Sequence, residues 1–110
     1  MKKFMLLYMS PMSAEERMAN KNPDEMKKMM EPWMAWKEKV GSALVDFGTP
    51  LLNGMHMTKD GSSKTSVQTT GYSVVQAENM EALKAMLSTH PYMMMPDSSV
   101  EVFEMMPMNM

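Results

Sequence analysis

The sequence contains no cysteine and only two histidines in 110 residues. The lack of cysteine excludes disulfide bonds, thiolate metal sites and a cysteine nucleophile, and it agrees with the cytoplasmic location that we predict. No charge of one sign dominates, because 13 acidic residues nearly balance 11 basic ones, for a formal net charge of -2. Without a basic excess, neither nucleic-acid binding nor attachment to a charged membrane surface is expected.

Long hydrophobic runs are also missing. The run from Phe4 to Met9 is too short for a signal-peptide core or a membrane span, so we interpret it as a strand. The sequence has no phosphate-binding glycine loop, no Gly-x-Ser-x-Gly elbow and no paired-histidine metal motif, and we predict no cofactor and no resident metal ion. With 45% hydrophobic residues, the chain can fill one modest core, and we expect a single domain over residues 1–110.

Methionine, in contrast, is abundant, with 20 residues. Because its side chain is flexible and polarizable, we expect most of these residues to fill gaps in the core. The alternative is Cu(I) binding, since thioether sulfur is a soft ligand that selects this ion. Three groups suggest it: Met55-His56-Met57, Met93-Met94-Met95 and the methionines between Met105 and Met110.

One long amphipathic stretch, from Asn22 to Gly48, organises the rest of the chain. Asn22 is a typical N-cap, Pro23 suits the first helical position, and Glu25 completes a capping box. Apolar residues then recur at spacings of three and four, and Gly48 is predicted to end the helix. Pro32 predicts a kink, with a complete break of the helix as the alternative.

The other predicted elements surround this helix. They are strands at Lys2 to Met9, Met55 to Lys59, Thr65 to Gln76 and Ser99 to Met106, a short helical turn at residues 14–19, and a second helix that starts at Asn79. The order strand-helix-strand-strand-helix-strand predicts a ferredoxin-like α+β fold, with a four-stranded antiparallel sheet and both helices on one face. Because the first strand is apolar on both faces, we predict a homodimer in which two sheets pack face to face.

Several short segments, in this order along the chain, carry a family resemblance. They are Lys3 to Tyr8, Trp33-Met34-Ala35-Trp36, Val45 to Leu51, Gly71-Tyr72-Ser73, His90-Pro91-Tyr92 and Val100-Glu101-Val102. Together they resemble the YCII-related family, including its DGPF-type members, in the dimeric α/β barrel superfamily. The resemblance implies a dimeric barrel and a cofactor-independent lyase or isomerase that acts on ring compounds. Asp60-Gly61-Ser62 stands where the family has Asp-Gly-Pro-Phe, and the histidine of the family's proposed His–Asp pair is missing from the long helix.

Two residues are candidates for proton transfer. His90 stands where the second helix meets Pro91 and can act as a general acid or base. The alternative role for His90 is to interact with the last carbonyl groups of that helix. Asp46 can pair with a histidine in space, and its alternative is simple solvation at the end of an element.

The candidates for ligand binding are Trp33, Trp36, Tyr8, Tyr72, Asn53 and His56. Trp33 and Trp36 share a helical face and can form the wall of an apolar pocket, or they can belong to the core. The two tyrosines can each present a hydroxyl group to a cavity. Asn53 as a turn residue and His56 as a solvent-exposed residue are the alternatives at those positions.

We therefore expect a homodimer that binds a small cyclic or aromatic molecule and acts on it as a lyase or isomerase. The alternative is a non-catalytic ligand-binding or interaction module that uses the same pocket. An enzyme needs two polar groups that converge in a dry cavity, whereas a binding module needs only a complementary shape.

Overall fold

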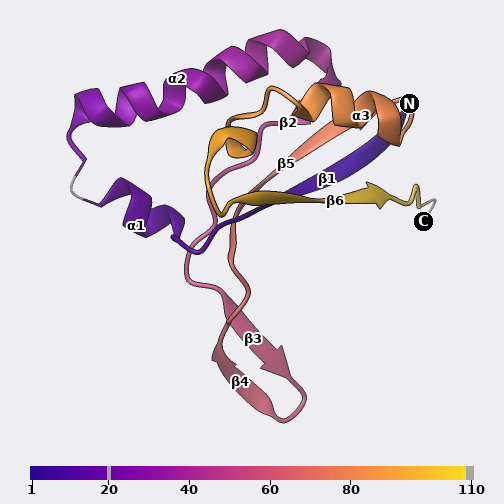
Figure 1. Ribbon diagram of the computed structural model, residues 1–110. Helices are drawn as coiled ribbons and strands as arrows, with labels where there is room; N and C mark the ends of the chain where they lie inside the picture. The colour runs from indigo at the N-terminus through magenta and orange to yellow at the C-terminus, as the bar shows by residue number, and fades with distance from the viewer. Residues whose placement is uncertain (20, 109–110) are drawn as a thin grey trace.

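The computed structural model describes residues 1–19 and 21–108 of the chain. In chain order its elements are β1 (Lys2–Met9), α1 (Ala14–Met18), α2 (Pro23–Val40), the 3₁₀ turn η1 (Gly41–Ala43), β2 (Leu44–Asp46), β3 (Met55–Thr58), β4 (Gly61–Lys64), β5 (Thr69–Ala77), α3 (Met80–Leu87), the 3₁₀ turn η2 (Pro91–Met94) and β6 (Ser99–Met105). Helices α2 and α3 cover one face of the main sheet, and the β3–β4 hairpin projects away from it (Figure 1).

The main sheet has four antiparallel strands in the order β2-β5-β1-β6. β1 lies at its centre, so that Leu6 is opposite Ser73 on β5 and Val102 on β6. This α+β arrangement is compatible with the predicted ferredoxin-like class. No helix in the described part of the chain is both long enough and apolar enough to cross a membrane.

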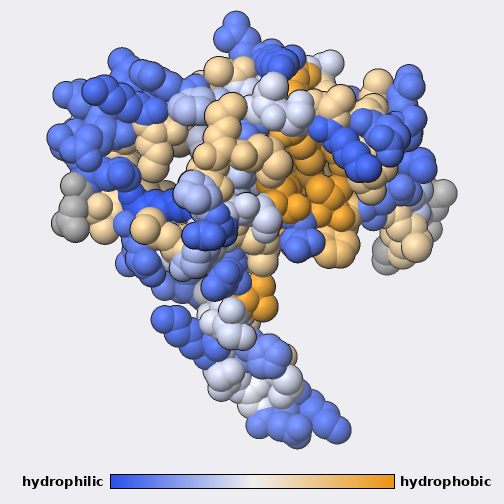
Figure 2. Space-filling model, in the orientation of Figure 1, coloured by the Kyte–Doolittle hydropathy of each residue, from blue (hydrophilic) through white to orange (hydrophobic). Residues whose placement is uncertain are grey.

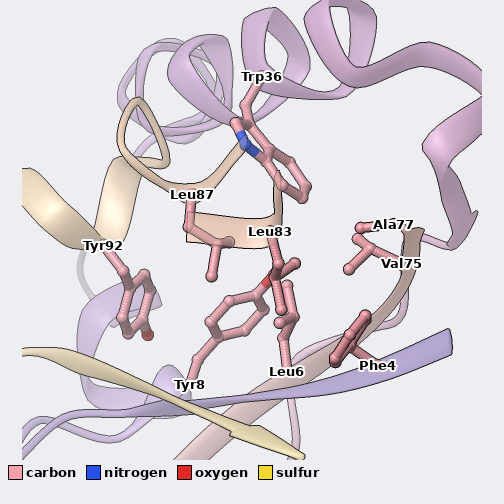
Figure 3. Packing of buried hydrophobic residues seen from close by; sticks show 9 residues of the cluster. All are labelled: Phe4, Leu6, Tyr8, Trp36, Val75, Ala77, Leu83, Leu87 and Tyr92. Atoms are coloured by element: carbon pink, nitrogen blue, oxygen red, sulfur yellow. The ribbon is translucent and has the colours of Figure 1, made fainter. Parts of the chain in front are cut away.

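The two faces of β1 have different environments. Phe4, Leu6 and Tyr8 point toward the helices and are 0–3% exposed. Figure 3 shows Trp36 pointing from α2 toward the sheet and Tyr8 and Leu6 pointing from β1 toward the helices, with Leu83 between them in one core cluster. The alternate residues, such as Met5, lie on the opposite face and are only half-buried. β1 is thus apolar on both faces, but its second face has no helix over it in Figure 1.

The predicted helix starts are confirmed by side-chain hydrogen bonds. The Asn22 Oδ1 accepts from the Glu25 N–H at 2.8 Å, and the Asn22 amide donates in return to the Glu25 carboxylate at 3.0 Å. The Asn79 Oδ1 caps α3 in the same way, at 2.8 Å from the Ala82 N–H. These contacts satisfy backbone donors that a helix leaves without intrahelical partners. α2 also runs through Pro32 without interruption, so the alternative of a broken helix is wrong.

The predicted end of the long helix at Gly48 is wrong. α2 ends at Val40, because Gly41 adopts a positive φ of 55° and donates its N–H to the Lys37 carbonyl. Leu44–Asp46 then forms β2, which pairs with β5 at the edge of the sheet. Gly48 does have a positive φ, of 78°, but it serves a close approach to the Tyr72 carbonyl of β5.

A strand does form at Met55–Thr58, close to the predicted range of Met55 to Lys59, but the prediction that it joins the main sheet is wrong. β3 pairs with β4 alone, in a separate two-stranded sheet, and β2 takes its place in the main sheet. We call this hairpin, β3 and β4 together, the arm. All eight of its strand residues are exposed. The radius of gyration is 15.4 Å, against about 13 Å for a compact chain of this length, in agreement with a projecting arm.

The expectation that methionine fills the core is wrong as well. Every fully buried hydrophobic side chain among the described residues is aliphatic, alanine or aromatic, and none is methionine. Among the described residues, 12 methionines are exposed, including Met94 at 75% and Met106 at 76%. Because branched and aromatic side chains from β1, β5, α2 and α3 already fill the interior, the flexible methionines lie at its margin and on the surface.

Candidate functional site

His90 lies at the centre of an aromatic cluster between α2 and the sheet. The residue is 0% exposed and forms the N-cap of η2. Its ring lies 4.5 Å from that of Trp36, 4.7 Å from Trp33 and 4.9 Å from Tyr8, between ring centroids. Four of the predicted site residues, from three separate elements, are therefore in contact here.

The hydrogen bonds of His90 define its tautomer. Nδ1 accepts from the backbone N–H of Tyr92 at 3.0 Å, so the proton of the neutral ring is on Nε2. Nε2 lies 3.1 Å from the Tyr8 hydroxyl and donates to it. The Tyr8 hydroxyl donates to Ser73 Oγ at 2.8 Å, and Ser73 donates to the Phe47 carbonyl at 2.6 Å. A directional chain of hydrogen bonds thus runs from η2 through β1 and β5 to the loop after β2.

The two ionisable groups in this chain of hydrogen bonds, His90 and Tyr8, are uncharged at neutral pH. Burial lowers the pKa of His90 to about 4, because the imidazolium would lose its solvation. Burial likewise raises the pKa of Tyr8 to about 12, and the hydrogen bond to Ser73 opposes this shift only in part. Tyr8 is therefore a donor and His90 a weak base whose accepting nitrogen is already occupied.

A second chain of hydrogen bonds starts at Arg17 of α1. The guanidinium donates to the Tyr92 hydroxyl at 3.1 Å and lies over its ring, with 5.0 Å from Cζ to the ring centroid. The Tyr92 hydroxyl is 2.6 Å from Thr70 Oγ1, which donates in turn to the Tyr8 carbonyl at 3.2 Å. The same guanidinium also donates to Ser10 Oγ. Tyr92 is thus shared between the charged group and the aromatic cluster.

Trp33 gives this cluster its contact with solvent. Its ring packs on Tyr8 at 5.1 Å and on Tyr92 at 5.6 Å, between centroids. Unlike Trp36, which is 2% exposed, Trp33 is only half-buried. Figure 2 shows a hollow in the surface below the N-terminal half of α2, on the side of α1. Because Trp33 is half-buried and His90 is 0% exposed, a molecule that approaches from solvent meets the Trp33 ring before it meets His90.

The remaining predicted site residues lie elsewhere. Tyr72 is on the opposite face of the sheet from Tyr8, and its hydroxyl donates to the Asp46 carboxylate at 3.4 Å. The same carboxylate accepts from the Gly48 N–H at 2.8 Å, which holds the turn after β2. Asn53 is exposed, with a positive φ of 54° in a loop, and His56 is exposed on the arm. The structure does not bring these four candidates to the aromatic cluster.

Two open hollows contain none of the clustered residues. One, of about 600 Å³, is lined by Met34, Ala35, Lys37, Glu38, Gly41 and Leu44, and the other, of about 280 Å³, lies beside His56 on the arm. Within residues 1–19 and 21–108, no three His, Asp or Glu side chains gather as metal ligands. The three methionine groups belong to the arm, to η2 with its following residue, and to the end of β6, and Met110 lies outside the described residues.

The structure adds four residues to the predicted set: Arg17, Thr70, Ser73 and Tyr92. Arg17 had one signal, since it is the single arginine among 11 basic residues. Ser73 and Tyr92 stand in segments that carry the family resemblance, but no local pattern marks either as a site residue. Thr70 gave no signal, because a threonine in a β-rich segment is ordinary.

A comparison of the chain with models of protein families, with curated proteins and with solved structures finds no match.

Proposed function

We propose that this protein binds a small cyclic or aromatic molecule against Trp33, in the hollow between α1, α2 and η2. The observation that carries the proposal is the contact of Trp33 with Tyr8, His90 and Tyr92, in which Trp33 alone is half-exposed. A large aromatic face held rigidly at a surface hollow is a good platform for a flat ring.

The face of α2 that continues from Trp33 supports the same location. Met26 and Met29 precede Trp33 at spacings of seven and four, so they lie on its helical face, and both are half-buried. Methionine side chains adapt their shape to a ligand at little cost in energy. The apolar wall of the proposed site therefore extends along α2 beyond the tryptophan.

Calorimetric titration of the full chain with one-ring compounds tests the proposal. We expect saturable binding of benzamide or benzoate with a dissociation constant of about 1 mM or tighter. The variant Trp33→Ala should weaken binding at least about 10-fold, because it removes the platform. Met34→Ala, an exposed position on the same helix that lines the separate hollow beside Gly41, is the matched control and should bind like the parent. Equal binding by both variants, or no binding by the parent, would contradict the proposal.

A second candidate function is the lyase or isomerase chemistry that the YCII-related resemblance implies. The chain of hydrogen bonds that links His90, Tyr8 and Ser73 favours it, because such a chain can relay a proton. His90 would then have to release the Tyr92 N–H to accept a proton. Deuterium uptake by cyclohexanone in D₂O, followed by NMR, should be faster with the parent than with His90→Gln. Equal rates would remove His90 from this role.

We also propose that the protein acts as a homodimer, as the barrel resemblance implies. The face of the sheet away from the helices carries Met5, Leu7, Val74, Phe103 and Met105. Phe103 is 56% exposed and Met105 is 37% exposed. A second copy packed on this face would bury these side chains, and a stable interface of about 1,200–2,000 Å² is of a size that a sheet face can provide.

The cytoplasmic location remains a prediction from the lack of cysteine.

A further inference from the structure

Arg17 is a cation held in place by neutral groups alone. Its guanidinium donates to the Tyr92 hydroxyl at 3.1 Å, to Ser98 Oγ at 3.3 Å and to Met95 Sδ at 3.5 Å, and it also donates to Ser10 Oγ. The side chain is partly buried. These contacts come from the end of β1, from η2 and from the loop before β6, so the charge has a defined position rather than moving freely in solvent.

No carboxylate forms an ion pair with this guanidinium in the part of the chain that the structure describes. The ion pairs found there join Lys2 to Glu104 and Lys84 to Glu81. A partly desolvated cation without a counter-charge is unfavourable, and an anion that reaches it gains charge-assisted hydrogen bonds. Arginine suits this task because its planar fork can bind both oxygens of one carboxylate, which lysine cannot do.

The charge adjoins the aromatic platform. Arg17 and Trp33 both contact Tyr92, with 5.0 Å from the guanidinium carbon and 5.6 Å from the indole to the centre of its ring. The charge of Arg17 and the ring of Trp33 are thus linked through one side chain, Tyr92. The hollow in Figure 2 lies between α1, which carries Arg17, and α2, which carries Trp33.

From these observations we infer that the ligand is a carboxylic acid, with its ring against Trp33 and its carboxylate bound by Arg17. This inference rests on the proposed function and adds the chemical class of the ligand. The carboxylate replaces the two longest contacts of the guanidinium, to Ser98 and Met95, and leaves those to Tyr92 and Ser10 in place. The ligand class is thus an aromatic or cyclic monocarboxylate.

Calorimetric titration of the full chain with benzoate and with benzamide distinguishes the contribution of the ligand's charge to binding from the contribution of its ring. The two compounds have nearly the same shape, and only benzoate is an anion. We expect benzoate to bind at least about 10-fold more tightly than benzamide, since hydrogen bonds to charged groups contribute more than neutral ones. Arg17→Met should abolish this preference, and Arg17→Lys should restore part of it. Lys21→Met removes the same charge from an exposed position nearby and should leave the preference unchanged.

The outcomes distinguish this inference from the proposed function. If both compounds bind the parent equally, the ring site stands and the role of Arg17 is overturned. If neither compound binds, the proposed function fails and the inference fails with it. A loss of preference in Lys21→Met as large as in Arg17→Met would show a general charge effect and overturn the inference. Should Arg17→Met not fold, the comparison between the parent and Arg17→Lys decides in the same way.

Discussion

His90 couples the aromatic cluster to the backbone of η2. Its Nδ1 accepts a hydrogen bond from the Tyr92 N–H, and its Nε2 donates one to the Tyr8 hydroxyl. The contact at Nδ1 requires a neutral ring, because a protonated Nδ1 cannot accept a hydrogen bond, and burial keeps the ring neutral by lowering the pKa of His90 to about 4. The residue thus makes the stability of the fold dependent on pH, whatever its role in chemistry.

The sign of this dependence follows from the two pKa values of His90. In the unfolded chain the imidazole has a pKa of about 6.5 and takes up a proton well before the folded protein does. Stability is therefore full above pH 6.5 and is lost as the pH falls from about 6.5 to about 4, by on the order of 3 kcal/mol. Urea unfolding at a series of pH values measures the loss.

Two variants test this assignment. His90→Gln should be less stable at pH 7. Its plot of stability against pH should be much flatter between pH 4 and 6.5, because glutamine at position 90 does not bind a proton. His56→Gln should keep the parental slope, since His56 is exposed on the arm. A slope that persists in His90→Gln would show that other groups cause the acid sensitivity.

At the scale of elements, the arm is set apart from the rest of the molecule. Its strands pair only with each other, and the backbone around it is joined by a hydrogen bond from the Thr65 N–H to the Gly54 carbonyl at 3.2 Å. An isolated two-stranded hairpin is only marginally stable in water. The arm therefore contributes little to the folding of the main sheet.

Deletion of residues 55–64, with two glycines inserted as a turn, should leave the domain folded. We expect its melting temperature to change by no more than about 5 °C, because the removed strand residues are exposed and bury no core surface. Circular dichroism during heating measures the effect. A loss of cooperative unfolding would mean that the arm stabilises the sheet through contacts with another copy of the chain.

At the scale of the whole molecule, the faces of the sheet differ in how well they are covered. The helices bury one face, and the other presents Phe103 at 56% exposure next to half-buried Met5 and Leu7. An apolar face of this kind on a small domain is typical of an interaction surface. This is the physical basis of the proposed homodimer.

Phe103→Glu should convert the proposed dimer into a monomer. The two-fold symmetry of a homodimer places two copies of residue 103 in one interface, so the substitution removes two aromatic contacts and adds two like charges. We expect the dissociation constant to rise by at least about 100-fold. Light scattering during gel filtration at micromolar concentration should give twice the 12.5 kDa chain mass for the parent and the single mass for the variant.

The control for this experiment is Met94→Glu. Met94 is 75% exposed and lies on η2, away from the uncovered face of the sheet, so its replacement should leave the dimer intact. A parent protein that elutes as a monomer would contradict the dimer proposal. Dissociation in both variants would show that added charge alone is responsible.

Local signals explain what could be predicted from the sequence. The caps at Asn22 and Asn79 act within three residues, and the structure confirms both. The strand Lys2 to Met9 was predicted with its observed bounds, since its alternating apolar residues and the following Ser-Pro are local features too. The spacing of Trp33 and Trp36 predicts that they share a helical face, and in the structure both contact the same ring, that of His90.

Long-range contacts decided the rest, for a physical reason. Leu44–Asp46 continues the apolar spacing of the preceding helix, and only pairing with β5 makes it a strand instead. Arg17 and Tyr92 are separated by 75 residues, and no local pattern brings them together. The sequence alone therefore determined where the helices and the first strand begin, and which faces of these elements are apolar. The tertiary structure decided which strand joins the sheet, that methionine is left outside the core, and that the single arginine adjoins the aromatic cluster.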